Sequence, residues 1–503
     1  MDSLILNNIG LVLIVIVGMM ATGIAVATAL RSNRDLKALK QQLEEARDLA
    51  LSPLQRQGPD VSDDIIFAEA PSALYLNVVT LLDIRCFRKL RIEFGQTGTP
   101  WLRTAVMGDN SVGKSTLLRA IALALCSEGD AIALMKATPG RMIREGEKEG
   151  EIRLELVDQE SGRSYRIVKT FERNADGVEV LQQKTRPPGG DFPWSSIFLC
   201  GYGTQRTAAA SSSFDTYSPR LAVSTLFDVK AVLQNPEVVL LRQPPPIRNS
   251  LMKKLQDVML LDTDGGAIAG TKTGLTLRGP WGAAPFDELS DGYRSTMQWL
   301  LDLFAWMMYA GRFPAEKEPA GILLIDEIEQ HLHPRWQRHI IRRLSRQLPR
   351  MQIITTTHTP LIASSMADVK SASLLRLYKG DAGDVEMEII ETDRLQGKRA
   401  DQVLTEFFDL TTSRNPGSSD DLTRYAELRS KTEIKDEEQM ELTNLTRRFD
   451  SVLRFGESDI ERKVEQAVSS ALDELIQRTP EVEFNVEAKR QLRALFPDGE
   501  GEE

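Results

Sequence analysis

The chain has 503 residues, a formal net charge of −10, 42% hydrophobic residues and 27% charged residues. This size and composition are ordinary for a globular chain of two or three domains, and the acidic balance argues against a nucleic-acid-binding coat along the whole chain. Its three cysteines, Cys86, Cys126 and Cys200, are scattered, form neither a disulfide framework nor a zinc-binding spacing, and fit a reducing cytosol.

The first thirty residues differ from the rest of the chain. Not one charged residue occurs from Ile9 to Leu30, and a helix of that length is sufficient to cross a bilayer core. A cleaved signal peptide is the competing interpretation, but the segment before Ile9 lacks Lys and Arg, and the apolar run is long for a signal. Because basic residues follow from Arg31, the positive-inside rule predicts one transmembrane helix over residues 1–30 in the inner (cytoplasmic) membrane, with the bulk of the chain in the cytoplasm. A short coiled coil and a linker are expected over residues 31–64.

A glycine-rich loop follows the predicted strand "TAVM" and precedes an apolar helix. Its sequence, "GDNSVGKST", matches G-x-x-x-x-G-K-S in the strand–loop–helix context that this pattern requires. Its backbone amides and the helix N-terminus are suited to surround phosphate oxygens, Lys114 to reach the terminal phosphates, and Ser115 to bind Mg²⁺. We therefore predict an ATP-binding loop with Mg²⁺ as cofactor, formed by Gly108, Asp109, Asn110, Ser111, Val112, Gly113, Lys114, Ser115 and Thr116.

Two carboxylates and a histidine follow two further predicted strands. The apolar segment "ILLI" ends in Asp326, which would hold Mg²⁺, and Glu327, which would act as general base on the attacking water. "MQIITTTHTP" places His358 at the carboxyl end of a strand, where an α/β sheet presents site residues, and its imidazole could contact the γ-phosphate and the water. The alternatives are acids that simply close a strand and a turn histidine before Pro360. The accompanying phosphate loop favours a catalytic role for Glu327, His358 and Lys114.

The other three histidines, His331, His333 and His339, crowd after the acidic pair. H-x-H alone is a weak metal signal, no cysteine is nearby and these residues start a helix, so a zinc-type site is not expected. Arginines in the same segment recur at helix-face spacing, at Arg335, Arg338, Arg342 and Arg346. They could bind nucleic-acid phosphates or form the solvated face of a helix, and the lack of interleaved aromatic residues favours the second interpretation.

The segment "ELSDGYRS" precedes another apolar helix. Alone, it is a helix start with Ser290 as N-cap and Gly292 as a spacer. Placed between the phosphate loop and "LLIDE", it resembles the "LSGGQ" signature of the ABC/SMC class of ATPases. In that class the signature of one subunit caps the γ-phosphate bound by the other. The resemblance therefore implies a homodimer in which Ser290 and Gly292 contact a partner's ATP. Asp291 and Tyr293 stand where the pattern has Gly and Gln.

Three further segments narrow the resemblance to one branch of that class. "LLDIRCFRKLRIEF", "IDEIEQHLHPRWQ" and "TTTHTPLIAS" are similar to segments of stand-alone bacterial ATPases of the OLD and Septu types, which are grouped broadly with the AAA family. The resemblance implies an α/β P-loop NTPase fold of ABC-ATPase type, with an antiparallel β lobe and a helical insert, over residues 65–395. A helical C-terminal region is expected over residues 396–503. No E…DxD pattern follows His358, so a Toprim nuclease of the OLD kind is not expected.

The insert between the phosphate loop and the signature offers one more candidate. "EIRLELVDQESGRSYRIVKTFER" predicts an antiparallel hairpin that turns at "ESGR", and "SIFLCGYGTQ" predicts a strand that ends at Gly201. Gln205 follows at the place of the Q-loop, which in the resembling class senses Mg²⁺ and the water, and Arg206 is a candidate phosphate contact. A glycine-rich surface loop is the alternative interpretation.

These features predict a membrane-anchored ATPase that hydrolyses ATP at a composite dimer interface. It would act as a switch or clamp in bacterial anti-phage defence or nucleic-acid surveillance, with a separate effector such as a nuclease, and this context follows from the resemblance alone. The alternative is the ATPase subunit of a membrane transporter, although a single helix cannot form a permeation path. A nucleotide sensor with little turnover is disfavoured by the intact Lys114, Asp326 and Glu327.

Overall fold

The computed structural model describes residues 74–449, with internal gaps at 97–98, 139, 176, 209–215, 262–264, 272–273, 281, 314–317, 382, 409, 411–419, 422, 426 and 429–434. The chain divides into two compact units, Met1–Leu410 and Thr411–Glu503. The transmembrane helix and the coiled coil that were predicted before residue 65 lie outside the described residues. Among the helices that the structure describes, none combines the length and apolar character needed to span a bilayer.

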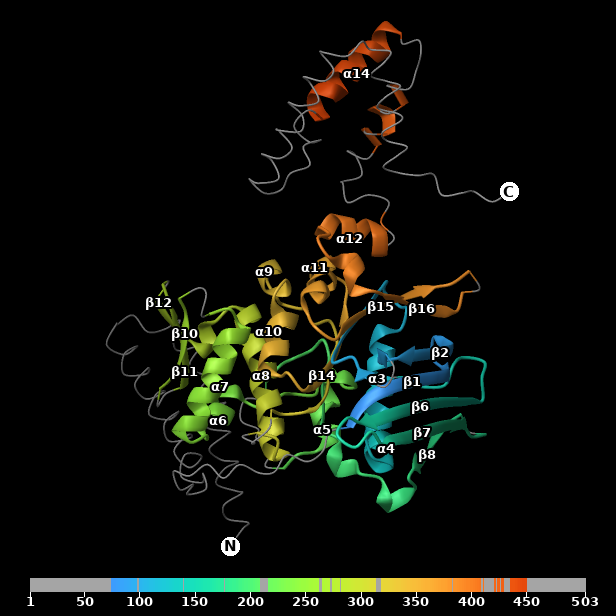
Figure 1. Cartoon of the computed structure of the whole chain (residues 1–503), viewed down its shortest axis with the longest axis vertical. Helices are drawn as coiled ribbons and strands as arrows, with labels where there is room; N and C mark the ends of the chain where they lie inside the picture. Colours follow the sequence, from blue (N-terminus) through green and yellow to red (C-terminus); the bar gives the residue numbers. More distant parts are fainter. Residues whose placement is uncertain are drawn as a thin grey trace, which may run out of the picture. The chain divides into compact units, whose positions relative to one another are not determined.

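A six-stranded sheet forms the centre of the first unit (Figure 1). Across the sheet, the order is β16 (Val385–Ile390), β15 (Ala372–Lys379), β5 (Arg103–Gly108), β14 (Met351–Thr357), β13 (Gly321–Ile325) and β9 (Leu199–Tyr202). All neighbours pair in parallel except β16, which is antiparallel to β15. Because the carboxyl ends of parallel strands meet at one edge, the segments that follow β5, β9, β13 and β14 are brought together there.

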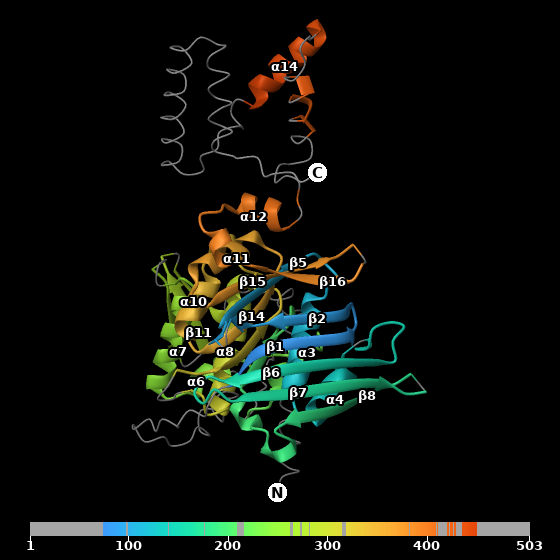
Figure 2. The same cartoon turned by 45° about the vertical axis from the view of Figure 1, so that its right-hand side comes forward.

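A second, antiparallel sheet forms the predicted β lobe. Its order is β2 (Phe87–Glu93), β1 (Leu74–Ile84), β6 (Glu149–Asp158), β7 (Ser164–Arg173) and β8 (Glu179–Arg186). The predicted hairpin is present as β6 and β7, whose side chains alternate between buried and accessible positions because one face covers a core. Helix α3 (Lys114–Leu125) packs between this lobe and the central sheet, and α4 (Glu128–Ala137) follows it (Figure 2).

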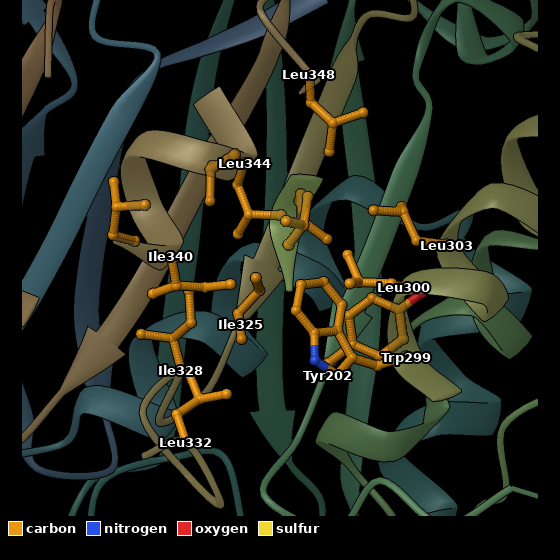
Figure 3. Packing of buried hydrophobic residues seen from close by; sticks show 14 of the residues in the cluster. Tyr202, Trp299, Leu300, Leu303, Ile325, Ile328, Leu332, Ile340, Leu344 and Leu348 are labelled. Atoms are coloured by element: carbon orange, nitrogen blue, oxygen red, sulfur yellow. The ribbon is translucent and has the colours of Figure 1, made fainter. Parts of the chain in front are cut away.

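The two faces of the central sheet bury alternate residues of each strand. Ile322 and Leu324 of β13 face α3 and the β lobe, whereas Leu323 and Ile325 face a layer of helices on the other side. That layer contains α8 (Asp291–Tyr309) and α10 (Ile340–Gln347), whose apolar residues surround the end of β13 (Figure 3). The phosphate-loop helix and the signature helix therefore lie on opposite faces of one sheet.

Shorter elements complete the first unit. Its other described helices are α5 (Pro219–Ala222), α6 (Pro236–Leu241), α7 (Pro245–Val258), α9 (Pro334–Gln337), α11 (Pro360–Ser365) and α12 (Ala400–Phe407). The 3₁₀ turns are η1 (Gly189–Asp191), η2 (Trp194–Ser196), η3 (Ser224–Leu226), η4 (Phe286–Glu288), η5 (Met366–Asp368) and η6 (Thr392–Leu395). The remaining strands are β3 (Gly95–Gln96) paired with β4 (Thr99–Pro100), and a three-stranded meander of β10 (Ala267–Thr271), β11 (Gly274–Gly279) and β12 (Gly282–Pro285).

The boundary between the units falls later than residue 396, where we expected the C-terminal region to begin. Val403 and Phe407 of α12 are buried in the main core of the first unit, so this helix belongs to the ATPase unit. In the second unit, α14 (Asp436–Phe449) is helical, as predicted, and Leu428, Leu442 and Leu445 form a small cluster of their own.

Candidate active site

Close backbone packing explains the two glycines that frame the phosphate loop. Gly108 has a φ of 149°, and a Cβ atom there would lie 2.2 Å from the carbonyl oxygen of Leu377. Gly113 has a φ of 95°, and its Cβ would lie 2.4 Å from Sγ of Cys86. A side chain at either position would force the loop away from β15 or from the turn between β1 and β2. The glycines thus hold the loop at the end of β5, directly before the N-terminus of α3.

Lys114 lies folded into the phosphate loop. Its Nζ donates hydrogen bonds of 2.8 Å to the carbonyl oxygens of Gly108 and Asp109 and lies 3.5 Å from Nδ1 of His358. Burial lowers the pKa of Lys114, while the negative charges of Asp326 and Glu327 act in the opposite direction. A buried ammonium group bound to loop carbonyls is pre-positioned to exchange these acceptors for phosphate oxygens, which are stronger partners.

One threonine positions both predicted acids. The Thr356 hydroxyl donates a 2.6 Å hydrogen bond to Oδ1 of Asp326 and accepts one of 2.7 Å from the backbone amide of Glu327. Asp326 is buried, and Glu327 has a φ of 47°, a backbone conformation that is uncommon for a residue with a side chain. Such strained residues concentrate at functional sites, so the backbone itself supports a functional role for Glu327.

His358 directly follows β14, at the carboxyl end of the strand, and lies near the second acid. Its Nε2 is 3.9 Å from Oε1 of Glu327, and its backbone amide donates a 2.5 Å hydrogen bond to Oε1 of Glu329. Burial and the neighbouring Lys114 lower the pKa of His358, which keeps the imidazole neutral at pH 7. Sequence reasoning missed Glu329, whose pKa is raised by burial and which holds the segment after β14 in place.

The donors at the loop fit a hard divalent cation. Asp326 offers a carboxylate and Ser115, half-buried in the first turn of α3, offers a hydroxyl, and oxygen donors of this kind suit Mg²⁺. Within the described part of the chain, no group of three His, Cys, Asp or Glu side chains could hold a metal ion. Of the crowded histidines, His333 accepts a hydrogen bond from the Arg335 amide as the N-cap of α9, and His339 precedes α10.

Arg206 differs from our expectation of a phosphate contact. Its guanidinium donates hydrogen bonds to the carbonyl oxygens of Asp326 (2.6 Å), Glu327 (3.0 Å) and Gly203 (3.0 Å). Arg206 is only 5% exposed, and its guanidinium faces the backbone because a buried donor group needs acceptors. Burial lowers the pKa of Arg206 to about 10, so the side chain stays charged at pH 7. Arg206 therefore supports the acidic loop from behind, while Gln205 is exposed on the preceding loop and its Q-loop role stays a prediction.

The signature segment is exposed at Ser290 and Asp291 and closely packed at Gly292. Ser290 is the exposed N-cap of α8, and its side chain makes no capping hydrogen bond. A Cβ atom on Gly292 would lie 2.5 Å from the carbonyl oxygen of His331, in the loop after the acids. Asp291 points into solvent and pairs with Arg294 at 2.6 Å, which explains how an acid is accommodated at this helix start. The contact of Ser290 and Gly292 with a partner's ATP stays a prediction.

The exposed arginines near the site fall into two groups. Arg346 and the half-buried Arg343 both pair with Asp257 of α7. The exposed side chains of the second group lie on or between α9 and α10, at Arg335, Arg338 and Arg342. Burial lowers the pKa of His339, and the charges of these arginines and of Arg343 lower it further. This pattern fits the solvated helix face that the sequence favoured, and nucleic-acid binding by it stays untested.

Residues 103–364 match the family described as "AAA domain, putative AbiEii toxin, Type IV TA system". The chain belongs to this family of AAA ATPases. It is 26% identical over 414 residues to the Septu protein PtuA of Bacillus mycoides (strain KBAB4), covering 78% of this chain and 53% of that protein. It is 29% identical over 147 residues to the Septu protein PtuA of Bacillus thuringiensis, covering 28% of this chain and 36% of that protein. The chain thus spans about half, or less, of the length of these relatives.

Among solved structures, the SMC head domain from Thermotoga maritima aligns with a TM-score of 0.37 and 17% identity. The alignment covers 63% of this chain and 99% of that domain. Within this family member, the structure brings together the phosphate-loop residue Lys114, His358 and the second acid, Glu327.

Proposed function

We propose that two copies of this ATPase form composite sites, in which the Ser290 end of one α8 completes the ATP site of the other. The observation that carries the proposal is the uncapped, exposed N-terminus of this 19-residue helix. Some other helices are capped by side chains, for example by Ser127, Asn235 and Thr359, whereas α8 shares the lack of a side-chain cap with α3, the phosphate-loop helix. The first-turn amides of α8 receive no hydrogen bond from the Ser290 side chain, and together with the positive end of the helix dipole they are suited to bind the γ-phosphate of a partner's ATP.

The residues of this chain then have distinct roles in hydrolysis. Lys114 moves from the loop carbonyls to the terminal phosphates and offsets their negative charge. The Glu327 carboxylate accepts a proton from the water that attacks the γ-phosphorus, and the neutral His358 orients that water by a hydrogen bond. Mg²⁺, when held by Ser115 and Asp326, would supply positive charge to the phosphate oxygens. Thr356 and Arg206 keep the acidic loop in position through their hydrogen bonds.

A mixed-subunit experiment tests the composite site. Lys114→Ala disables one chain's own ATP site, and Ser290→Arg disables the capping end that it lends to a partner. Each variant alone should be inactive as a homodimer. An equimolar mixture should regain part of the steady-state ATP turnover, because one mixed site has both an intact Lys114 and an intact Ser290. If the mixture stays as inactive as the separate variants while both still bind ATP, the composite site is refuted.

We further propose that the ATPase acts in bacterial defence against phage, anchored to the inner membrane and working with a separate effector such as a nuclease. Support comes from the relatedness to Septu proteins and from the uncharged segment between Ile9 and Leu30. In cells that carry this gene together with the genes beside it in its genome, Lys114→Ala should abolish protection in phage plating assays.

The membrane anchor has its own test. Removal of residues 1–30 should shift the chain from the membrane pellet to the supernatant, and a chain that stays in the pellet would refute the anchor.

A further inference from the structure

Tyr202 joins two parts of the active site that are far apart in sequence. As the last residue of β9, it accepts a 2.8 Å hydrogen bond from the backbone amide of Asp326 through its carbonyl oxygen. Its hydroxyl donates a 2.9 Å hydrogen bond to Oδ2 of Asp302, in the middle of α8. Asp302 lies about three helical turns from Ser290. One residue thus contacts both the loop that carries the acids and the helix that presents the signature.

Asp302 is an unusual residue for the position that it occupies. It is only 2% exposed, in the core between α8 and the central sheet, and the backbone amide of Gln234 donates a 2.9 Å hydrogen bond to its Oδ1. The indole of Trp306 is a third donor. An apolar residue would fill this space without the free-energy cost of burying a carboxylate. Packing alone therefore does not explain why an aspartate occupies this position.

Neighbouring contacts also connect α8 with β9 and with the segment that follows the acids. The ring of Tyr202 packs against Trp299 of α8, with centroids 5.6 Å apart (Figure 3). At the start of α8, Gly292 lies against the His331 carbonyl. The ring of Tyr293 packs edge-on against Trp336, with ring centroids 4.5 Å apart. The helix is therefore fixed to the segment after β13 at two points along its axis. Two such points determine the direction in which the N-terminus of α8 faces.

We infer that Asp302 and Tyr202 are positioning residues, which set the orientation of the signature end of α8 relative to the acids of the same chain. This inference rests on the proposed composite site and deepens it. The hydrogen bond between the two side chains links hydrolysis in one subunit to the capping end that this subunit offers to its partner. Loss of the bond leaves the cis phosphate loop intact and misdirects Ser290.

Tyr202→Phe is the direct test, because it removes one hydroxyl and keeps the ring against Trp299. We expect kcat to fall about tenfold, with the ATP concentration for half-maximal rate changed less than twofold. Tyr217→Phe is the matched control. It also removes a hydroxyl that contacts β9, through hydrogen bonds to the backbone amide and carbonyl of Leu199. Its kcat should stay within about twofold of wild type. A Tyr202→Phe chain with unchanged kcat, or with a kcat matched by Tyr217→Phe, would overturn the inference.

Rescue separates positioning from loss of folding. Asp302→Asn keeps an oxygen that can accept the Tyr202 bond and should retain at least half of kcat, whereas Asp302→Leu should lose as much as Tyr202→Phe. Thermal melting confirms that each variant is folded. If Asn and Leu reduce kcat equally in folded proteins, the hydrogen bond is not what positions the helix.

Mixed subunits distinguish this inference from the composite site itself. Tyr202→Phe is added to the Lys114→Ala subunit, which contributes only its signature end to the active mixed site. We expect the turnover of the mixture to fall about tenfold relative to the mixture without the change. Unchanged turnover refutes the inference but leaves the composite site standing. Absence of activity already in the mixture without Tyr202→Phe refutes the composite site.

Discussion

Gly292 lies where its own chain leaves no space for a side chain. Because the His331 carbonyl is a backbone group, it cannot move aside without a shift of the loop that follows the two acids. We expect Gly292→Ala to lower the free energy of unfolding by about 1–3 kcal/mol, as for other overpacked sites, and to reduce ATP turnover. Urea unfolding and steady-state kinetics measure the two effects.

Gly129 offers a matched control for that substitution. It lies in α4, and a Cβ atom there would meet nothing within 4 Å. Gly129→Ala should therefore raise the free energy of unfolding by up to about 1 kcal/mol, because alanine favours the helix. Equal effects of the two substitutions would contradict the steric explanation for Gly292.

At the same scale, the sequence identified residues that belong to a pattern and missed those that act through the backbone. The phosphate loop, Asp326, Glu327 and His358 are marked by motifs, and the structure brings them together. Arg206 and Glu329 bind main-chain atoms instead, and no pattern marks the carbonyl or amide that a side chain will contact. Asp291, the acid that departs from the signature pattern, differs from these two because it pairs with the side chain of Arg294, three residues later.

At the scale of elements, strands and helices were predictable, but the bond that ties α8 to β9 was not. From Trp299 to Tyr309 the segment of α8 is apolar except for Asp302, and an apolar run of this kind predicts a buried helix. Its partner Tyr202 is 100 residues away in the sequence, so only the folded sheet shows why the acid is present. The order of strands in the sheet likewise depends on parallel pairing between distant segments, which local periodicity does not determine.

The burial of Asp302 predicts a specific dependence of stability on pH. Burial raises its pKa from 3.8 to about 6 in the folded state, although the bonds from Gln234 and Tyr202 act in the opposite direction. The unfolded chain therefore loses this proton first, and the contribution of Asp302 to stability falls as pH rises from about 4 to about 6. A shift of about two units corresponds to about 3 kcal/mol.

Asp302→Asn removes this titration and isolates its effect. The free energy of unfolding of the variant, relative to wild type, should rise by about 3 kcal/mol between pH 4 and pH 7. Urea unfolding at several pH values measures the difference, with Asp368→Asn, at an exposed position, as a control that should run parallel to wild type. Parallel curves for Asp302→Asn would show that the carboxylate is not destabilised by burial.

At the scale of the whole molecule, the end of the ATPase unit is decided by core packing rather than by composition. The composition becomes more charged after about residue 396, but α12 returns to the main core and the second unit begins only at Thr411. Within the second unit, Arg424 pairs with Glu441 at 2.9 Å, and the unit has a small leucine cluster of its own. The two units can therefore be separated by experiment.

Two truncations that differ only in α12 test this boundary. A chain that ends at Leu410 keeps Val403 and Phe407 in the core and should bind ATP like the full chain, with a Tm within a few degrees of it. A chain that ends at Leu395 loses both side chains, each of which contributes about 1.5–3 kcal/mol when fully buried. We therefore expect it to be less stable by about 3–6 kcal/mol, to melt at a clearly lower temperature and to expose an apolar surface that promotes aggregation. If both truncations melt alike, α12 is not part of the ATPase unit, and the boundary belongs near residue 396, where the composition changes.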